Sequence, residues 1–198
     1  MKKVVLSLAA MLAFGLANAQ ETTTDNGGFS QGDVFISGSV GYGSDEDFNG
    51  DKVNEFNISP KAGYFVTNNI AVGLSLGYTN SKTEESGEAD TKFNTFEVGA
   101  FGRYYFTPAS QFSIFGQLGL GYSTSKAEQG DAETKFNGFN VGLAPGISYF
   151  VSKNIALEAT FGLLGYQSVK NDDTDAKADS FDLGLDLGDI NFGIVYKF

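Results

Sequence analysis

The chain has 198 residues, no cysteine and no histidine, and it carries 13 basic against 24 acidic side chains, a net charge of −11. This length suits one domain, and without cysteine no disulfide framework can support it. The acidic balance argues against nucleic acid as a partner.

Residues 1–19 have the pattern of a cleaved signal peptide. Lys2 and Lys3 precede an apolar core, and Ala17-Asn18-Ala19 forms the cleavage site. The core is too short to span a membrane as a helix. Export removes two of the 13 basic residues and none of the 24 acidic ones, so the net charge becomes −13. Residues 20–32 are polar and unpatterned, and we expect them to be a lead without fixed structure, followed by one domain over residues 33–198.

Three stretches of this domain are versions of one sequence. They begin at Lys52, Lys92 and Lys135, and each opens Lys-x-Asn-x-Phe, turns near its middle after an aromatic cluster, and closes Gly-Tyr. The spacing between copies is 40 and then 43 residues. Apolar residues alternate with period two inside each copy, which predicts a β-hairpin repeated along the chain.

Each predicted strand has one large apolar face and one face of Gly, Ser, Asn and charged residues. The run IAVGLSLGYT at residues 70–79 is the clearest case. A soluble sandwich would bury its large residues, and the small face would then meet water in every strand. We instead predict a narrow lumen lined by the small face, with the apolar face turned outward to lipid.

We predict an all-β fold, an eight-stranded antiparallel up-and-down transmembrane β-barrel. The strand ranges are 33–43, 53–65, 70–79, 92–106, 112–123, 136–150, 155–166 and 181–197. Connections are short at one end (VTNN, TPASQ, VSKN) and long and acidic at the other (SDEDFNGDK, NSKTEESGEADT, TSKAEQGDAET, QSVKNDDTDAKADS). This asymmetry is typical of outer-membrane barrels. Two shifts of the apolar phase predict β-bulges, at Phe161 to Leu164 and at Gly188-Asp189.

Aromatic residues gather at both ends of the apolar band. The four strands that run toward the long connections all end Gly-Tyr, and other tyrosines lie near the short turns. Tyr suits a membrane interface because its ring is apolar while its hydroxyl reaches water. We therefore predict an aromatic girdle that consists of Tyr42, Tyr64, Tyr78, Tyr104, Tyr122, Tyr149 and Tyr166.

The last predicted strand ends in an alternating apolar row that closes on an aromatic residue. Its members are Ile190, Phe192, Ile194, Tyr196 and Phe198. This row resembles the C-terminal signal that the barrel-assembly machinery reads in bacterial outer-membrane proteins. With the repeats and the loop asymmetry, residues 33–198 resemble the small OmpX/OmpA-type family of outer membrane protein β-barrel domains.

The resemblance implies a Gram-negative outer membrane, with both termini in the periplasm and the long loops outside the cell. It also implies contact with the lipid bilayer and its lipopolysaccharide, and passage through the barrel-assembly machinery. The family's roles range from adhesion to envelope integrity. We expect a monomer without a cofactor.

Six charged residues fall on the predicted lumen face. We expect Lys61, Arg103, Glu158 and Lys197 at similar depth, with Glu55 and Glu97 farther from the short turns. Because buried charges must be paired to be tolerated, these residues favour a salt-bridged plug. The alternative is a gated path for ions or small solutes.

The first acidic loop places Asp45, Asp47, Asn49 and Gly50 at the spacing that opens an EF-hand calcium loop. The closing acid falls one position early, at Glu55, and flanking helices are missing, so we expect no specific metal site. Acidic loops of this kind stay solvated, and they could also be bridged by divalent ions to lipopolysaccharide phosphates.

Three classes of function fit these patterns: a structural or surface-interaction barrel, a small channel, and a soluble lipocalin-like carrier. Enzymes built on small outer-membrane barrels use a histidine in an acid–base or nucleophilic arrangement, and this chain has none. We therefore predict a non-enzymatic barrel whose acidic loops face outward.

Deleting Phe198 tests the assembly signal. The finished barrel loses at most the few kcal/mol of one buried aromatic side chain, roughly 1.5–3 kcal/mol. If Phe198 is read during assembly, we expect much lower surface levels and periplasmic proteolysis in cells, while the same variant refolds in detergent from urea. Normal outer-membrane levels would show that Phe198 is only a girdle residue.

Overall fold

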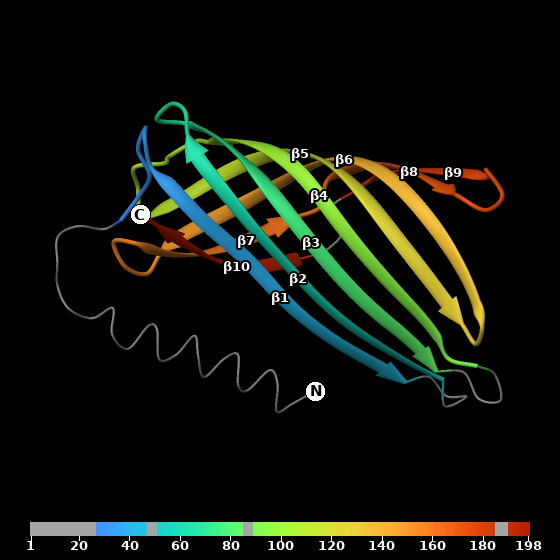
Figure 1. Ribbon diagram of the computed structural model, residues 1–198. Helices are drawn as coiled ribbons and strands as arrows, with labels where there is room; N and C mark the ends of the chain where they lie inside the picture. Colours follow the sequence, from blue (N-terminus) through green and yellow to red (C-terminus); the bar gives the residue numbers. More distant parts are fainter. Residues whose placement is uncertain (1–26, 47–50, 85–88, 185–189) are drawn as a thin grey trace.

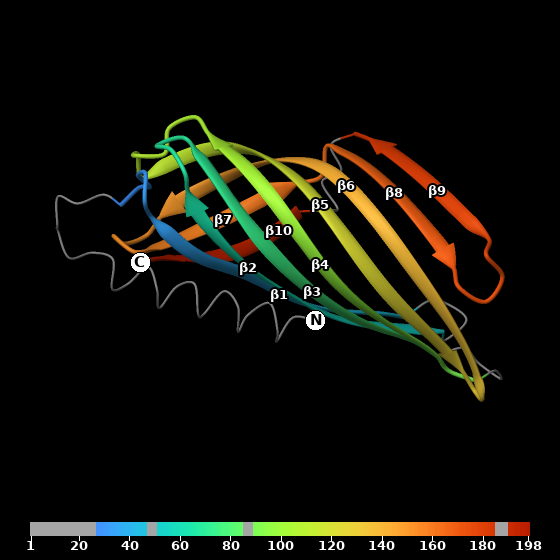
Figure 2. The same cartoon turned by 45° about the horizontal axis from the view of Figure 1, so that its top comes forward.

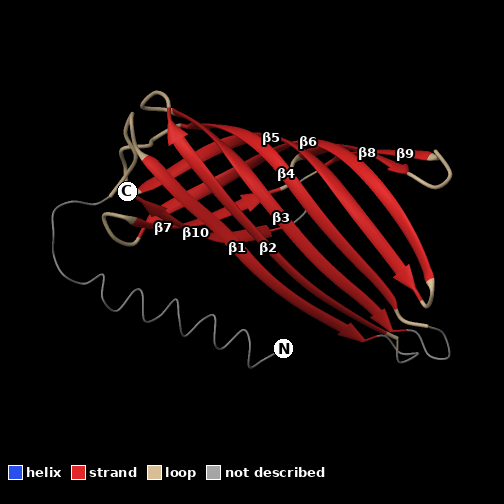
Figure 3. Ribbon diagram, in the orientation of Figure 1, coloured by secondary structure: helices blue, strands red, loops and turns tan. Residues whose placement is uncertain are grey.

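The computed structural model describes residues 27–46, 51–84, 89–184 and 190–198, and Figure 3 shows that they form strands and connections. Within these ranges no helix is long and apolar enough to cross a membrane. The predicted signal peptide and residues 20–26 lie outside the described residues, as does the predicted bulge at Gly188-Asp189.

The described residues contain ten strands, and all the pairings between them are antiparallel (Figure 1). Their bounds are β1 Val34–Glu46, β2 Lys52–Phe65, β3 Ile70–Glu84, β4 Thr91–Tyr105, β5 Phe112–Gln129, β6 Ala132–Phe150, β7 Ile155–Phe161, β8 Leu164–Asn171, β9 Lys177–Leu183 and β10 Ile190–Lys197.

Eight of these strands close into a barrel. Strands β1 to β7 follow one another around the ring, and β10 lies between β7 and β1. The predicted eight-stranded antiparallel barrel is therefore confirmed. We call the end with connections 66–69, 106–111 and 151–154 the short-turn end, and the opposite end the long-loop end.

The seventh and eighth predicted strands each divide in two. Between paired positions, Phe161, Gly162 and Leu163 stand opposite only Ala144 and Pro145 of β6, which is the extra residue of a β-bulge. The phase shift in the sequence predicted this bulge. Beyond it, β8 pairs with β6 and β9, and the β8–β9 hairpin leans away from β1 (Figure 2). The prediction that residues 155–166 and 181–197 are single strands is wrong for this reason.

Strands also run farther at the long-loop end than the apolar pattern predicts. Strands β5 and β6 pair as far as Gln129 and Ala132, and a two-residue turn at Gly130-Asp131 joins them. Gly130 has a φ of 58°, a conformation that glycine adopts without steric cost. The long loop predicted for TSKAEQGDAET is therefore a hairpin extension, held by polar cross-strand contacts.

In two of the short turns, an asparagine makes the same pair of hydrogen bonds to the neighbouring strand. The side-chain amide of Asn69 donates to the carbonyl of Tyr105 at 2.8 Å, and the Tyr105 N–H donates to the Asn69 carbonyl at 2.8 Å. Asn154 makes the same two bonds with Lys197. Each turn thus ties the end of its hairpin to the neighbouring strand, which fixes the register at this end.

The large apolar face points outward along the whole barrel. Leu74 is 67 % exposed and Leu118 is 57 % exposed, values that a soluble sandwich or a lipocalin-like carrier would not leave in the middle of its strands. This surface suits the hydrocarbon layer of a membrane.

A charged side chain on this outer face should lower the free energy of unfolding, and more so the closer it lies to the middle of the apolar band. Leu74→Arg or Leu118→Arg should destabilise the barrel by about 2–4 kcal/mol, whereas Tyr78→Arg at the edge of the band should cost about 0–1 kcal/mol. Urea unfolding in lipid vesicles measures the difference. Equal costs at the three positions would mean that this face does not meet lipid.

Candidate functional site in the lumen and at the long-loop rim

An aromatic plug fills the lumen at the short-turn end. Its rings come from five barrel strands and from the segment before β1, and their contacts run without interruption: the Phe65 and Tyr105 ring centroids are 5.1 Å apart, and those of Tyr105 and Phe115 are 5.0 Å apart. All members are buried: Phe29, Phe35, Phe65, Phe101, Tyr105, Phe115 and Phe150. These rings therefore occupy the lumen at this end of the barrel.

Phe29 comes from the segment before β1, and its ring inserts into the lumen at the short-turn end. It is 2 % exposed and stacks on Phe65 with 4.6 Å between ring centroids. Its N–H donates to the Pro108 carbonyl at 2.7 Å, and the Lys197 ammonium donates to the carbonyl of Gly28. The expectation that the whole lead lacks fixed structure is wrong for residues 27–32, because one apolar side chain anchors them in the lumen.

Glycines on the lumen face make room for these rings. A Cβ atom on Gly63 would collide with the ring of Phe35, and one on Gly146 would collide with the ring of Phe115. In an eight-stranded barrel the interior is just wide enough for side chains, so large rings need such neighbours. The small face seen in the sequence is thus the space that the plug occupies.

A buried ion pair lies next to the plug, on the side toward the long-loop end. The Arg103 guanidinium, 2 % exposed, donates to both carboxylate oxygens of Glu158 at 3.0 Å. It also donates to the Tyr105 hydroxyl at 2.9 Å and to the Gln117 side-chain oxygen at 2.8 Å, and its charged carbon lies 4.5 Å from the centroid of Phe115. The pair is therefore hydrogen-bonded on both sides, the condition under which buried charges are tolerated.

The structure brings together only some of the predicted lumen charges. Lys61 lines the same cavity as Arg103 and Glu158. Glu97 lies farther toward the long-loop end, where its carboxylate accepts a hydrogen bond from Asn140 at 3.0 Å.

The other two predicted charges lie away from this layer. The Lys197 ammonium is 3.7 Å from the Asp33 carboxylate at the short-turn rim, so the expected common depth is wrong for Lys197. Glu55 is exposed and stands opposite Gly43 near the long-loop end.

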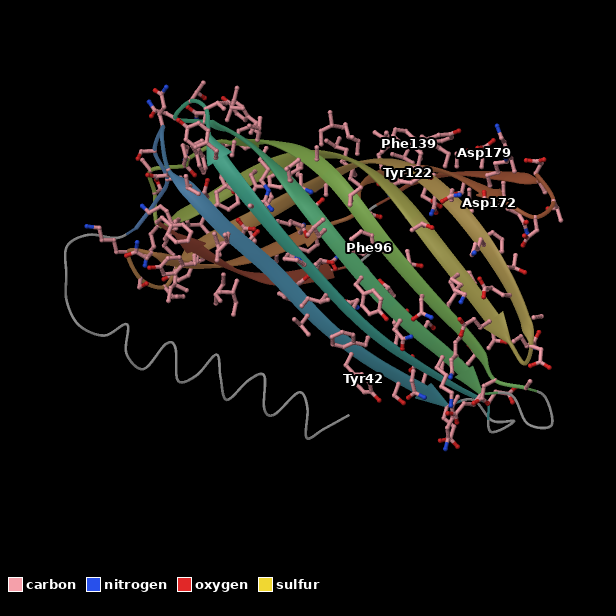
Figure 4. All side chains as sticks on the ribbon, viewed as in Figure 1. Tyr42, Phe96, Tyr122, Phe139, Asp172 and Asp179 are labelled. Atoms are coloured by element: carbon pink, nitrogen blue, oxygen red, sulfur yellow. The ribbon has the colours of Figure 1, made fainter. Side chains whose placement is uncertain are left out.

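Near the long-loop end, each hairpin carries one Tyr–Phe pair on its outer face. The tyrosine of the repeat's closing Gly-Tyr stands directly opposite the phenylalanine of the next Lys-x-Asn-x-Phe. The pairs are Tyr42 with Phe56, Tyr78 with Phe96, Tyr122 with Phe139, and Tyr166 with Phe181. Figure 4 shows Tyr122 and Phe139 on neighbouring strands in this half of the barrel. Each of these hairpins therefore presents two aromatic side chains at the same level of the outer face.

The fourth pair reveals a copy of the repeat that the sequence analysis missed. Residues 177–181 read Lys-Ala-Asp-Ser-Phe, which is the opening motif with Asp179 in place of asparagine. The Tyr166 hydroxyl donates to Asp179 at 3.1 Å, as the Tyr78 hydroxyl donates to Asn94 at 3.2 Å. The Lys-x-x-x-Phe pattern that follows a Gly-Tyr, here after a segment of similar length, is the signal that could have identified it.

The predicted girdle residues all lie on the outer surface. Tyr42, Tyr78, Tyr122 and Tyr166 lie toward the long-loop end, and Tyr64, Tyr104 and Tyr149 toward the short-turn end. Of the predicted assembly row, Phe192, Ile194, Tyr196 and Phe198 are exposed, and the rings of Tyr196 and Phe198 meet edge-on with 5.0 Å between centroids. The aromatic-band and assembly roles themselves remain predictions.

Ion pairs hold the hairpins together beyond the girdle. The Lys82 ammonium donates to carboxylate oxygens of Asp90 and Glu84, each at 2.7 Å. These hydrogen bonds, the one to Asp90 being the larger cause, raise the pKa of Lys82 to about 12. Lys126 makes the same arrangement with Glu128 and Glu133. The lysines neutralise part of the acidic surface, so strand pairing continues into water.

The loop with EF-hand-like spacing remains untested, because residues 47–50 lie outside the described residues. Among the residues that the structure does describe, no group of three acidic side chains is placed to hold a metal ion.

A closed eight-stranded barrel with an apolar outer band and a filled lumen defines a small transmembrane β-barrel protein. The chain matches the family described as "Outer membrane protein beta-barrel domain" over residues 6–198, and it belongs to that family. It is an outer-membrane protein embedded in the bilayer. A comparison with curated proteins gives no match.

Several solved structures share the fold. Neisserial surface protein A is 18 % identical, with 86 % of this chain and 99 % of that chain covered and a TM-score of 0.54. The outer membrane protein OprG from Pseudomonas aeruginosa is 14 % identical, with 86 % and 98 % covered and a TM-score of 0.55. A major outer membrane protein from Thermus thermophilus is 12 % identical, with 84 % and 99 % covered and a TM-score of 0.50.

The buried pair predicts a marked asymmetry between single and double substitutions. Arg103→Met or Glu158→Leu alone should destabilise the barrel by about 3–5 kcal/mol, because one buried charge stays unpaired, and the double variant should recover most of this loss. Breaking the exposed pair with Lys126→Met should cost about 0–1 kcal/mol and serves as the control. Urea unfolding in vesicles gives each value. A double variant as unstable as the sum of the singles would contradict the pairing.

Proposed function

We propose that this protein is a non-enzymatic, non-conducting barrel that holds acidic hairpins at the cell surface, in a structural or surface-interaction role such as adhesion or envelope integrity. The observation that carries the proposal is the contrast between the two ends of the barrel. The plug fills the short-turn end, while polar hairpins extend beyond the girdle at the long-loop end.

The two chain ends support an orientation with the long-loop end outside. The Phe198 N–H donates to the Val34 carbonyl at 3.0 Å, and Phe29 inserts at the same end of the barrel, where Figure 1 also places the C-terminus. A chain delivered from the periplasm keeps both termini there, with its short turns on the same side. Lipopolysaccharide would then surround the long-loop end, and the barrel-assembly machinery would meet the final strand.

The charge of the hairpins supports contact with other molecules at the surface. The β8–β9 connection carries three exposed aspartates, Asp172, Asp173 and Asp175. Within the described part of the chain, only Asp175 of the three forms a salt bridge, with Lys170. One solved protein of the same fold is named a surface protein. The monomeric state is part of the proposal, because a closed ring needs no second copy to complete it.

A site for a specific protease inserted at residues 172–176 tests the surface location. We expect cleavage by protease added to intact cells, whereas the same site inserted at residues 66–69 should be cut only after the outer membrane is permeabilised. Binding of these cells to cationic surfaces should fall after Asp172→Asn and Asp173→Asn, because these carboxylates supply negative charge at the tip. Cleavage at residues 66–69 on intact cells would invert the orientation.

A second candidate function, a small channel, is separated by conductance. In planar bilayers we expect no steady single-channel steps, because packed rings occupy the lumen. Stable steps from the unaltered protein would contradict the non-conducting barrel and favour the channel.

A further inference from the structure

The wall of the barrel has a seam between its first and last strands. Strands β1 and β10 share a ladder of four residue pairs, Phe35–Gly38 with Ile194–Lys197, and the hydrogen bond from the Phe198 N–H to the Val34 carbonyl extends it at the short-turn end. From Ser39 toward the long-loop end, no pair between described residues continues it. All other strand pairs that complete the ring have at least five pairs. Among the described residues, the β1–β10 ladder is therefore the shortest in the ring, and it leaves β1 unpaired on this side beyond Gly38.

A polar cavity of about 30 Å³ opens at this seam. Its walls come from Ser37 and Ser39 of β1, from Asn191 of β10, and from the layer of Arg103 and Glu158. This volume holds one or two water-sized groups. A carboxylate has two oxygens of that size, whereas a phosphodiester with its glycerol would not fit.

The cavity offers positive charge and an unused hydrogen-bonding group. Arg103 and Glu158 neutralise each other, and Lys61, which also lines the cavity, forms no ion pair with any described residue. The Ser37 hydroxyl is buried and has no hydrogen-bond partner among the residues described. The Lys61 side chain is half-buried. A partly desolvated cation and a hydroxyl without a partner both cost free energy, and an anion between them would satisfy both.

An apolar groove of about 620 Å³ lies on the outer face beside the seam. It shares Ser37, Gly38 and Lys61 with the cavity. Its floor is formed by small residues, Gly38 and Ala62, and Leu74 and Ile194 rise on its two sides. Nearby, the β2–β3 ladder skips Ser59 and Pro60, because proline has no N–H to donate. The groove is long and apolar, as an alkyl chain requires.

We propose that this seam binds a long-chain carboxylate, the anion of a fatty acid, with its headgroup between Lys61 and Ser37 and its chain in the groove. The charge of the cavity selects an anion, its size selects a carboxylate, and the adjoining groove selects a single long chain. The site lies in the wall of the barrel, away from the acidic hairpins. Fatty-acid binding and the proposed surface role can therefore be tested separately.

Fluorescence titration with cis-parinaric acid tests the site, using the full barrel in lipid nanodiscs. We expect saturable binding of about one molecule per barrel, displaced by oleate and not by methyl oleate, which lacks the charge. Lys61→Met should weaken binding ~10–100-fold, the range that loss of a charge-assisted hydrogen bond gives. Ser37→Ala should weaken it several-fold, and Ala62→Phe should block it by filling the groove.

Lys135→Met is the matched control, because Lys135 is an exposed lysine at the long-loop end. It should bind the probe like the unaltered protein. A mobility shift between unheated and boiled samples checks that each variant is folded, and Ala62→Phe and Ser37→Ala keep the test decisive if Lys61→Met does not fold. Binding that never saturates, or that is equal for Lys61→Met, Ala62→Phe and Lys135→Met, would reflect partition into the bilayer and would overturn the proposal.

Discussion

The rest of this structure depends on one constraint, the pairing of backbone N–H and C=O groups where water is absent. An unpaired group in hydrocarbon costs several kcal/mol, so a spanning sheet must close on itself. Closure with eight strands leaves an interior only wide enough for side chains. The alternation of large and small residues follows directly, because outward positions meet lipid and inward positions must share a narrow space. The asparagine bonds at the short turns extend this pairing, whereas the bulge opposite Ala144 and Pro145 interrupts it.

The outer half of the structure could be predicted from the sequence because one simple pattern specifies it. Alternation with period two identified the strand faces, and the loop asymmetry and the Gly-Tyr endings identified the two rims. Strand ends beyond the girdle could not be found in this way, since both faces of such strands are polar and the alternation disappears. Ion pairs such as Lys126 with Glu133 lie across those strand ends, and they depend on register rather than on residue type.

The lumen was predicted less completely. The prediction of a salt-bridged interior identified Arg103 and Glu158 as residues of one layer. It also placed Lys197 in that layer, and it assigned no part of the lumen to aromatic rings. Several rings in the plug stand next to an outward tyrosine in the sequence, as in Tyr64-Phe65 and Tyr149-Phe150, and the girdle prediction used only the tyrosine of each pair. Alternation places the neighbour of an outward tyrosine on the inward face, but it does not show that these inward rings meet one another across the lumen. Phe29 could not be predicted at all, because the polar residues around it resemble a linker.

The four Tyr–Phe pairs have a consequence for how barrels of this kind change in size. Each pair joins residues 14 to 18 positions apart in the chain, within one hairpin, and none needs a residue from another hairpin. A duplicated hairpin would therefore bring its own Tyr–Phe pair and leave the existing pairs intact. The chain is in this sense modular, and the evolutionary step from eight to ten strands would need only a copied segment and a lumen able to refill the wider ring.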